Sequence, residues 1–245
     1  IWKYNKAVKD KSVGQEAIES VLRQIIQVKV IGKEAAIEKV QLETDEKEEA
    51  DYRAKTVFDS IPAKDKQTQG IELKVLSKIF EENKLAQKMY NVQMGKLKID
   101  YAANTLSAAK VELIYQAANA KNKETVKNTM SQILSEVTSS QNSFYTVAKN
   151  KTQADAIEYV IGNQDSRTNL AKAVVSLKKN QTSALIEEKD GFYIAHCIQT
   201  NSAALQQQYR NQLVSEKQTE SFQKIYKTWS DKFDVKVSKA LLAAN

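Results

Sequence analysis

Two stretches in the second half of the chain decide the fold: LAKAVVSLKKNQTS at residues 170–183 and GFYIAHCI at residues 191–198. In the first, apolar residues recur at helical spacing from Leu170 to Leu177. The second is an almost continuous apolar run that begins at a glycine, as is typical of a buried strand. A compact helix followed by a buried strand is therefore expected here.

The same mixture of patterns continues upstream of these stretches. Val111, Leu113 and Tyr115 alternate with other residues as in a short strand, and the alternation returns at residues 157–161. Between them, apolar spacing predicts a long helix over residues 123–138 and a shorter one near residues 144–148. The order strand, helix, helix, strand, helix, strand predicts an α+β (βααβαβ) unit over residues 107–201.

The segments on either side of this unit have helical patterns. Helices are predicted over residues 15–30, 44–61 and 71–95, and Thr44 is the expected N-cap of the second because acidic residues follow it. The polar stretch 63–70, after the only proline, is expected to be a loop. We therefore predict three segments: a helical N-terminal lobe over 1–106, the α+β unit over 107–201, and a C-terminal helix over 202–245.

Scarce residue types exclude several classes of enzyme. The 245 residues include 6 Gly, 1 His and 1 Cys. A closed zinc site takes about four imidazole, thiolate or carboxylate ligands, so zinc, iron–sulfur and thiol redox sites built from His and Cys are excluded. Glycines at 14, 32, 70, 95, 162 and 191 cannot form either Gly-rich phosphate loop, which excludes the common ATP-binding and dinucleotide-binding enzymes.

The net charge of +7 is spread along the chain: +2 over residues 1–106, +2 over 107–199 and +3 over 200–245. Proteins that bind nucleic acids concentrate cations on one face or stripe, and no segment does so here. We therefore predict a solvated Lys-rich surface and no nucleic-acid partner. No run approaches the roughly 18 apolar residues of a membrane-spanning helix.

The quoted stretches resemble the parvulin-type peptidyl-prolyl isomerases. Residues 170–183 are similar to the family pattern F-x-x-A-x-x-x-L-x-x-G-x-x-S, and GFYI at 191–194 is similar to G-[YI]-H-I. NAKNKE at 119–124 and NSFYTVA at 142–148 are similar to the start of the family's long helix and to its D-F-x-x-L-A segment. The resemblance covers residues 110–199 and implies a parvulin-like domain inserted between helical segments.

The flanks resemble one branch of that family, the bacterial extracytoplasmic foldases PrsA and SurA. The resemblance rests on LRQIIQVKV at 22–30, EAA at 34–36 and QLETDE at 41–46, and on the apolar residues of the C-terminal segment. The resemblance implies a C-terminal helix that returns to the N-terminal lobe. It also implies unfolded client polypeptides as partners, a place at the bacterial surface or in the periplasm, and no metal or organic cofactor. Attachment through a lipidated Cys upstream of Ile1 and a homodimer are both compatible with it.

The resemblance also locates the active-site positions. Rotation of a prolyl amide crosses a barrier of about 20 kcal/mol, and parvulins lower it with a polar network that includes a His on the first strand and a His on the last. Leu113 and Tyr193 stand at those two positions. The family's middle S-x-[CD] segment corresponds to Thr152-Gln153-Ala154, with Asp155 one place late. The implied substrate-binding residues are Leu113, Ile157, Tyr159, Leu170 and Tyr193, with Leu170 in the proline pocket.

The remaining polar candidates have alternative interpretations. His196 and Cys197 are neighbours in a strand, so their side chains point to opposite faces and cannot form a nucleophilic pair; His196 also lies opposite the face of Tyr193. The Tyr193 hydroxyl could donate to a substrate carbonyl, or the ring could simply fill the space across from Leu113. Asp155 could supply a carboxylate or be solvated.

Three functions remain open on this evidence. The first, which we favour, is an ATP-independent extracytoplasmic chaperone whose isomerase activity is weak or lost. The second is an active peptidyl-prolyl isomerase that uses Tyr193 and Asp155 in an altered site. The third is a non-catalytic surface interaction protein in which the parvulin-like unit is only a scaffold. The sequence leaves open whether the protein is an enzyme.

Overall fold

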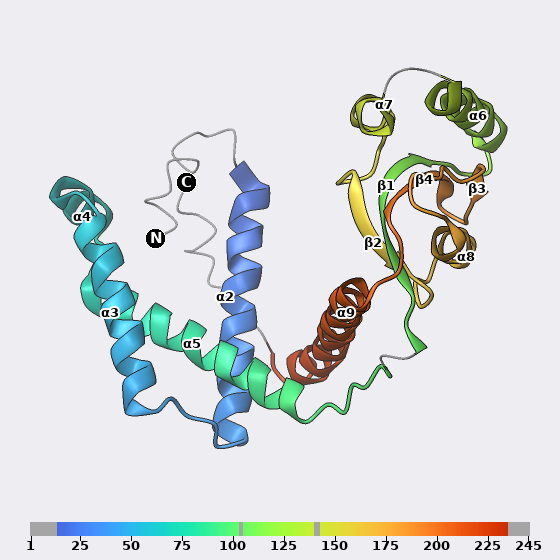
Figure 1. The fold of residues 1–245 in the computed structure, drawn as a ribbon. Helices are drawn as coiled ribbons and strands as arrows, with labels where there is room; N and C mark the ends of the chain where they lie inside the picture. Colours follow the sequence, from blue (N-terminus) through green and yellow to red (C-terminus); the bar gives the residue numbers. More distant parts are fainter. Residues whose placement is uncertain (1–13, 103–104, 140–142, 235–245) are drawn as a thin grey trace. The chain divides into compact units, whose positions relative to one another are not determined.

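The computed structural model describes residues 14–102, 105–139 and 143–234, shown in Figure 1. The chain divides into two separately packed units. We call residues 1–98 with 218–245 the helical unit and residues 99–217 the mixed unit. The last helix, α9 (Ala203–Ser230), contributes its first part to the mixed unit and its second part to the helical unit.

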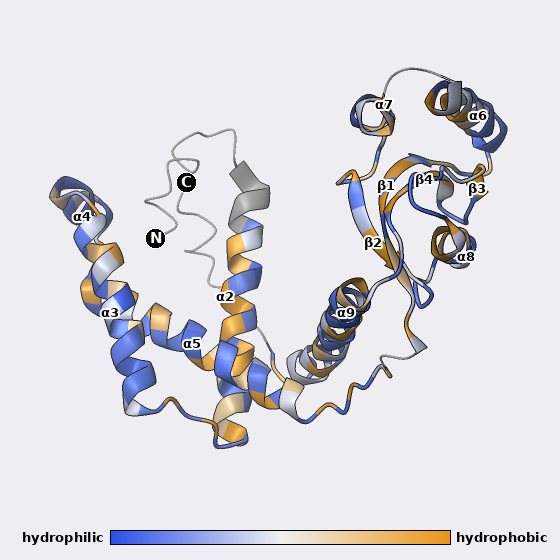
Figure 2. Ribbon diagram, in the orientation of Figure 1, coloured by the Kyte–Doolittle hydropathy of each residue, from blue (hydrophilic) through white to orange (hydrophobic). Residues whose placement is uncertain are grey.

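Four further helices build the described part of the helical unit: α2 (Gly14–Ile37), α3 (Thr44–Ser60), α4 (Ala63–Gln69) and α5 (Leu73–Gly95). Figure 2 shows their hydrophobic and hydrophilic positions interleaved along each helix. Two small cores result from this pattern. One joins α3 to α5 through Ala54, Ile61 and Leu76, and the other joins α2 and α5 to α9 through Val30, Ile31, Ala35, Met89 and Trp229.

Two local predictions for the helical unit are wrong. Residues 63–69 form helix α4 rather than a loop. A proline is compatible with the start of a helix as well as with the end of one, and Pro62 is the N-cap of α4. Gly70 ends the helix in a left-handed conformation, with φ at 60°. The N-cap of α3 is Glu43, not Thr44. The Glu43 backbone N–H donates to the Glu46 carboxylate at 2.8 Å, so an acidic residue at the third helical position closes the cap.

The mixed unit confirms the predicted α+β class. Its elements are β1 (Ala108–Ala117), α6 (Lys123–Ser139), α7 (Phe144–Lys151), β2 (Glu158–Gly162), α8 (Thr168–Ser176), β3 (Ile186–Glu187) and β4 (Gly191–Gln199). The strands form one antiparallel sheet in the order β2-β1-β4-β3. The two-residue strand β3 is an addition to the predicted βααβαβ order, and it makes β2 and β3 the two edges.

Alternation along β1 and β4 gives the sheet two buried faces. Val111 and Leu113 face α8 and share a core with Leu170 and Val174. Ile114 belongs to a second core, with Phe192, Ile194 and the apolar residues of α6 and α7. Figure 1 shows α8 on one side of the sheet and α6 with α7 on the other. Both faces of the two central strands are therefore covered.

The first part of α9 packs against the β2 edge of the mixed unit. Tyr209, which is 1% exposed, lies over Gly162, where a Cβ would come within 2.3 Å of its ring and 2.6 Å of the Ser107 carbonyl oxygen. The Tyr209 hydroxyl accepts a hydrogen bond from the Gln164 backbone N–H at 3.1 Å. Burial raises the pKa of Tyr209 to about 12. Glycine at position 162 is thus what allows the helix to approach the strand.

Replacement of that glycine tests this contact. We expect Gly162→Ala to lower the stability of the mixed unit by about 1–3 kcal/mol, because the added methyl group overlaps a fixed ring and a backbone oxygen. Gly95→Ala is the matched control, since a Cβ there meets nothing within 4 Å. Urea unfolding followed by circular dichroism measures both variants, and equal midpoints would contradict the packing described for Tyr209.

One buried ion pair ties the end of α9 into the helical unit. The carboxylate of Glu34 in α2 is 2% exposed, and the Lys232 ammonium donates to its two oxygens at 3.1 and 3.2 Å. A carboxylate removed from water is costly unless a cation or hydrogen-bond donor compensates it. The pairing therefore fixes the place where the chain leaves α9 against α2.

Removal of the Lys232 ammonium tests how much this ion pair contributes to stability. We expect Lys232→Met to destabilise the helical unit by about 1–3 kcal/mol, because Glu34 stays buried without its partner. Lys227→Met removes the cation of an exposed i,i+4 pair with Asp231 and should change stability by less than about 0.5 kcal/mol. Glu34→Gln in the Lys232→Met background should recover part of the loss. Thermal unfolding of the four proteins checks all three expectations.

Candidate functional site

The candidate site lies where the end of β1 runs beside the start of β4. Tyr115 is directly opposite Tyr193, and the two rings stack with their centroids 4.6 Å apart. Leu113 is opposite Ala195, so the expectation that a Leu lies across from Tyr193 is wrong. The register is set by Gly191, where φ is 155° and a Cβ would lie 2.1 Å from the Gln116 carbonyl oxygen.

Both tyrosine hydroxyl groups are engaged by the turn between β3 and β4. The Tyr193 hydroxyl donates to the Asp190 carboxylate at 2.6 Å, and the Tyr115 hydroxyl donates to the Asp190 backbone carbonyl at 3.0 Å. Burial, and then the bond to Asp190, raise the pKa of Tyr193 far above its usual value. The Tyr193 hydroxyl hydrogen is therefore already used within the protein and is not free to bind a substrate carbonyl.

An arginine completes this cluster. The Arg167 guanidinium lies 5.7 Å from the centre of the Tyr193 ring and forms two parallel hydrogen bonds to Asp165, at 2.9 and 2.6 Å. The bond to Asp165 raises the pKa of Arg167 further. Alternation along the strand places Tyr115 on the same face of the sheet as Leu113, so the sequence could have predicted its position. No sequence pattern pointed to Arg167. The ends of β1 and β4 thus carry an aromatic and ionic cluster whose polar groups are paired within the protein.

The predicted substrate-binding residues separate into two groups. Leu113 and Leu170, 1% and 0% exposed, lie in the same core as Tyr193, and Tyr159 packs against it. Ile157 packs against the core on the other face of the sheet. The structure thus brings four of the five residues together and places the two leucines in the interior. Contact between these residues and a substrate stays a prediction.

The two middle positions differ in their surroundings. The Thr152 hydroxyl oxygen accepts from the backbone N–H groups of Tyr115 and Ala154, at 3.0 and 3.1 Å, so it holds the loop after α7 against β1. Asp155 lies in that loop with an exposed side chain. Thr152 therefore has a structural role here, and a catalytic role for Asp155 stays a prediction.

The single histidine lies on the opposite face, as predicted. The His196 ring stacks on Phe144 at 5.3 Å, and its Nδ1 lies 2.9 Å from the Thr182 hydroxyl oxygen. Glu112 is its cross-strand neighbour. Burial lowers the pKa of His196 and, together with the charge of Glu158, raises the pKa of Glu112. Both shifts favour the neutral forms of these two half-buried side chains.

The Glu112 shift predicts a pH effect on stability. Because its pKa is raised in the folded protein, folding favours the protonated acid, and this contribution is lost as pH rises above the usual value of 4.5. Glu112→Gln should therefore raise the thermal unfolding midpoint at pH 7 by about 1–3 °C and change it little at pH 4.

Glu38→Gln should change the thermal unfolding midpoint at pH 7 in the opposite direction. Hydrogen bonds from Lys96 and Gln93 lower the Glu38 pKa, so its stabilisation is present above the usual value and lost as pH falls. This variant should lower the midpoint at pH 7. If the two variants shift the midpoint in the same direction, the assigned pKa causes are wrong.

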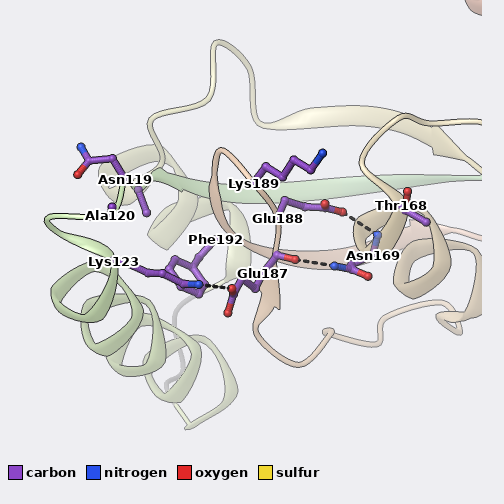
Figure 3. A pocket seen from close by; sticks show the side chains of 10 residues that line it. Asn119, Ala120, Lys123, Thr168, Asn169, Glu187, Glu188, Lys189 and Phe192 are labelled. Carbon is purple, nitrogen blue, oxygen red and sulfur yellow. Dashed lines mark hydrogen bonds and ion pairs between the residues drawn. The ribbon is translucent and has the colours of Figure 1, made fainter.

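A pocket of about 510 Å³ lies on the β3 side of the sheet, shown in Figure 3. It lies between the N-terminal ends of α6 and α8. The Lys123 ammonium pairs with the Glu187 carboxylate at 2.6 Å, and the Glu188 carboxylate accepts from the backbone N–H groups of Asn169 and Leu170 at 2.7 and 2.9 Å. The other lining residues are Ala118, Asn119, Ala120, Thr168, Lys189 and Phe192.

In the described ranges, no group of three or more His, Cys, Asp or Glu side chains is placed to hold a metal ion. None of the described helices is both long and apolar enough to cross a bilayer.

Comparison with protein families identifies the mixed unit. Residues 106–199 match the family model described as Rotamase, the PPIC-type PPIase domain. This part of the chain is a parvulin domain of the PPIC type, which confirms the resemblance found in the sequence. A search of curated proteins found no significant match.

Solved structures similar to the whole chain include foldases and chaperones. PrsA from Bacillus anthracis is 15% identical, with 89% of this chain and 99% of that chain covered and a TM-score of 0.45. PrsA from Streptococcus pneumoniae is 14% identical, with coverage of 98% and 94% and a TM-score of 0.38. A SurA-like chaperone from Campylobacter jejuni is 12% identical, with coverage of 90% and 87% and a TM-score of 0.33.

Proposed function

We propose that this protein is an ATP-independent chaperone of the PrsA and SurA type, in which the parvulin domain binds polypeptide but has weak or no isomerase activity. The main support for weak or absent activity is that the Tyr193 hydroxyl is hydrogen-bonded to Asp190 at the position where the family has an imidazole. With Leu113 buried at the other imidazole position, the polar network expected of an isomerase is not assembled.

The helical unit supports the binding of unfolded chains. Several large apolar side chains are exposed on its helices: Ile25 is 46% exposed, Ile37 62%, Tyr52 73% and Val75 52%. The proposal assigns these side chains to contact with the apolar residues of an unfolded chain. In this proposal, residues 1–106 and 202–245 hold the client, and residues 107–201 supply the parvulin domain.

The cellular setting belongs to the same proposal. The sequence resemblance to PrsA and SurA favours a place outside the bacterial cytoplasm, where ATP is not available to drive release. Partners would be unfolded or partly folded exported proteins. A lipid anchor upstream of residue 1 and a homodimer are compatible with this setting, and the complete gene sequence and analytical ultracentrifugation test them.

Suppression of aggregation tests the chaperone function. An equimolar amount of the protein should reduce light scattering by thermally unfolded citrate synthase, without added ATP. The double variant Ile37→Ser with Tyr52→Ser should lose at least half of this effect, because exposed apolar surface is removed. Tyr145→Ser is the matched control, since it removes an exposed aromatic side chain (45%) from α7 of the parvulin domain. Unchanged scattering with the original protein would refute the chaperone function.

A prolyl isomerisation assay separates the chaperone from the active isomerase. With a short proline-containing peptide, we expect the rate to equal the uncatalysed rate, and Tyr193→Phe to leave it there. A faster rate that disappears in Tyr193→Phe would instead establish an active site built on this hydroxyl.

A further inference from the structure

We propose that the pocket beside β3 receives an extended client segment, which pairs through its backbone with Glu187 as an additional strand of the sheet. This inference rests on the proposed chaperone function and specifies how the parvulin domain would hold a client. It concerns a different surface from the tyrosine cluster, because neither Tyr115 nor Tyr193 lines the pocket.

The direction of the Glu187 backbone groups follows from the ladder between β3 and β4. Glu188 donates its backbone N–H to the Gly191 carbonyl at 2.9 Å, so these two residues face one another across the turn. In an antiparallel pair, bonded and non-bonded positions alternate. Glu187, which is opposite Phe192, is therefore a non-bonded position whose N–H and C=O point away from β4.

A side chain outside the sheet confirms this direction. The Asn169 amide nitrogen at the start of α8 donates to the Glu187 carbonyl oxygen at 2.8 Å, from the pocket side (Figure 3). This bond occupies the acceptor that a backbone N–H of an added strand would use. Among the described residues, the Glu187 N–H has no acceptor of its own. The Glu187 N–H is thus available to an added strand. The Glu187 carbonyl oxygen becomes available when the Asn169 side-chain amide moves away.

The chemistry of the pocket wall fits an extended segment with little sequence preference. Charges of both signs surround it, namely Lys123, Lys189, Glu187 and Glu188. Lys123 and Glu187 neutralise each other, and the Glu188 carboxylate is occupied by the start of α8. Recognition through main-chain hydrogen bonds suits such a surface, because strand addition takes its affinity from the backbone. A chaperone that must accept many sequences needs this kind of recognition.

The test removes the open donor without breaking the sheet. Glu187→Pro lacks the backbone N–H, and proline is tolerated on an edge strand when the missing N–H faces outward. Glu187→Gln is the matched control, because it also loses the ion pair with Lys123 but keeps the N–H. The probe is a short fluorescent peptide of alternating Thr and Val, with binding to the full chain followed by anisotropy.

Two opposite changes are expected. Glu187→Pro should weaken binding about tenfold relative to Glu187→Gln, through the loss of one backbone pair. Asn169→Ala should strengthen binding about threefold, because the competing amide is gone; a residue with only a structural role would not raise the affinity. The same peptide with N-methylated backbone amides should bind the original protein as weakly as the original peptide binds Glu187→Pro.

Equal affinity of Glu187→Pro and Glu187→Gln, with both folded by circular dichroism, would overturn the inference. So would a change confined to self-association, in which Glu187→Pro converts a dimer to a monomer and leaves peptide binding unaltered. The outcome is separable from the chaperone test. If scattering is suppressed but the two Glu187 variants bind alike, only this inference fails. If scattering is unaffected but Glu187→Pro still weakens peptide binding, only the chaperone function fails.

Discussion

The mixed unit depends on the close pairing of β1 with β4, which are the two central strands of its sheet. Gly191 lets the β4 backbone approach Gln116 more closely than any side chain would permit, and this contact fixes the register. The register then places Tyr115 beside Tyr193 and gives each strand one face toward α8 and the other toward α6 and α7. Both cores of the unit, and the tyrosine cluster, follow from it.

The resemblance predicts that Tyr193 stands at one of the family's imidazole positions, and Tyr193 belongs to the tyrosine cluster. In an isomerase, the groups at these positions must stay available to a twisted amide. Here Tyr115, Tyr193 and Asp190 satisfy one another, and Arg167 is neutralised by Asp165. A polar network that is complete within the protein stabilises the domain but leaves little to offer a transition state. In the function proposed above, the domain keeps its fold and serves binding rather than catalysis.

The sequence was a good guide to class and elements and a poor guide to side-chain partners. Periodicity located the principal strands and nearly all helices because it records which faces are buried. It missed α4, which is short and polar, and it missed β3, whose two residues are too few to show alternation. Arg167 and Asp190 could not be found either, because their roles depend on tertiary distances between the start of α8 and the β3–β4 turn.

The side-chain amide of Asn169 also bears on the solubility of the protein. An unprotected sheet edge invites the same edge of another copy, and natural proteins block such edges with bulges, charges or covering segments. A hydrogen bond that occupies the outer carbonyl of β3 and a nearby ion pair at Lys123 provide both kinds of protection at once. The β3 edge of one copy is thereby guarded against pairing with the same edge of another copy.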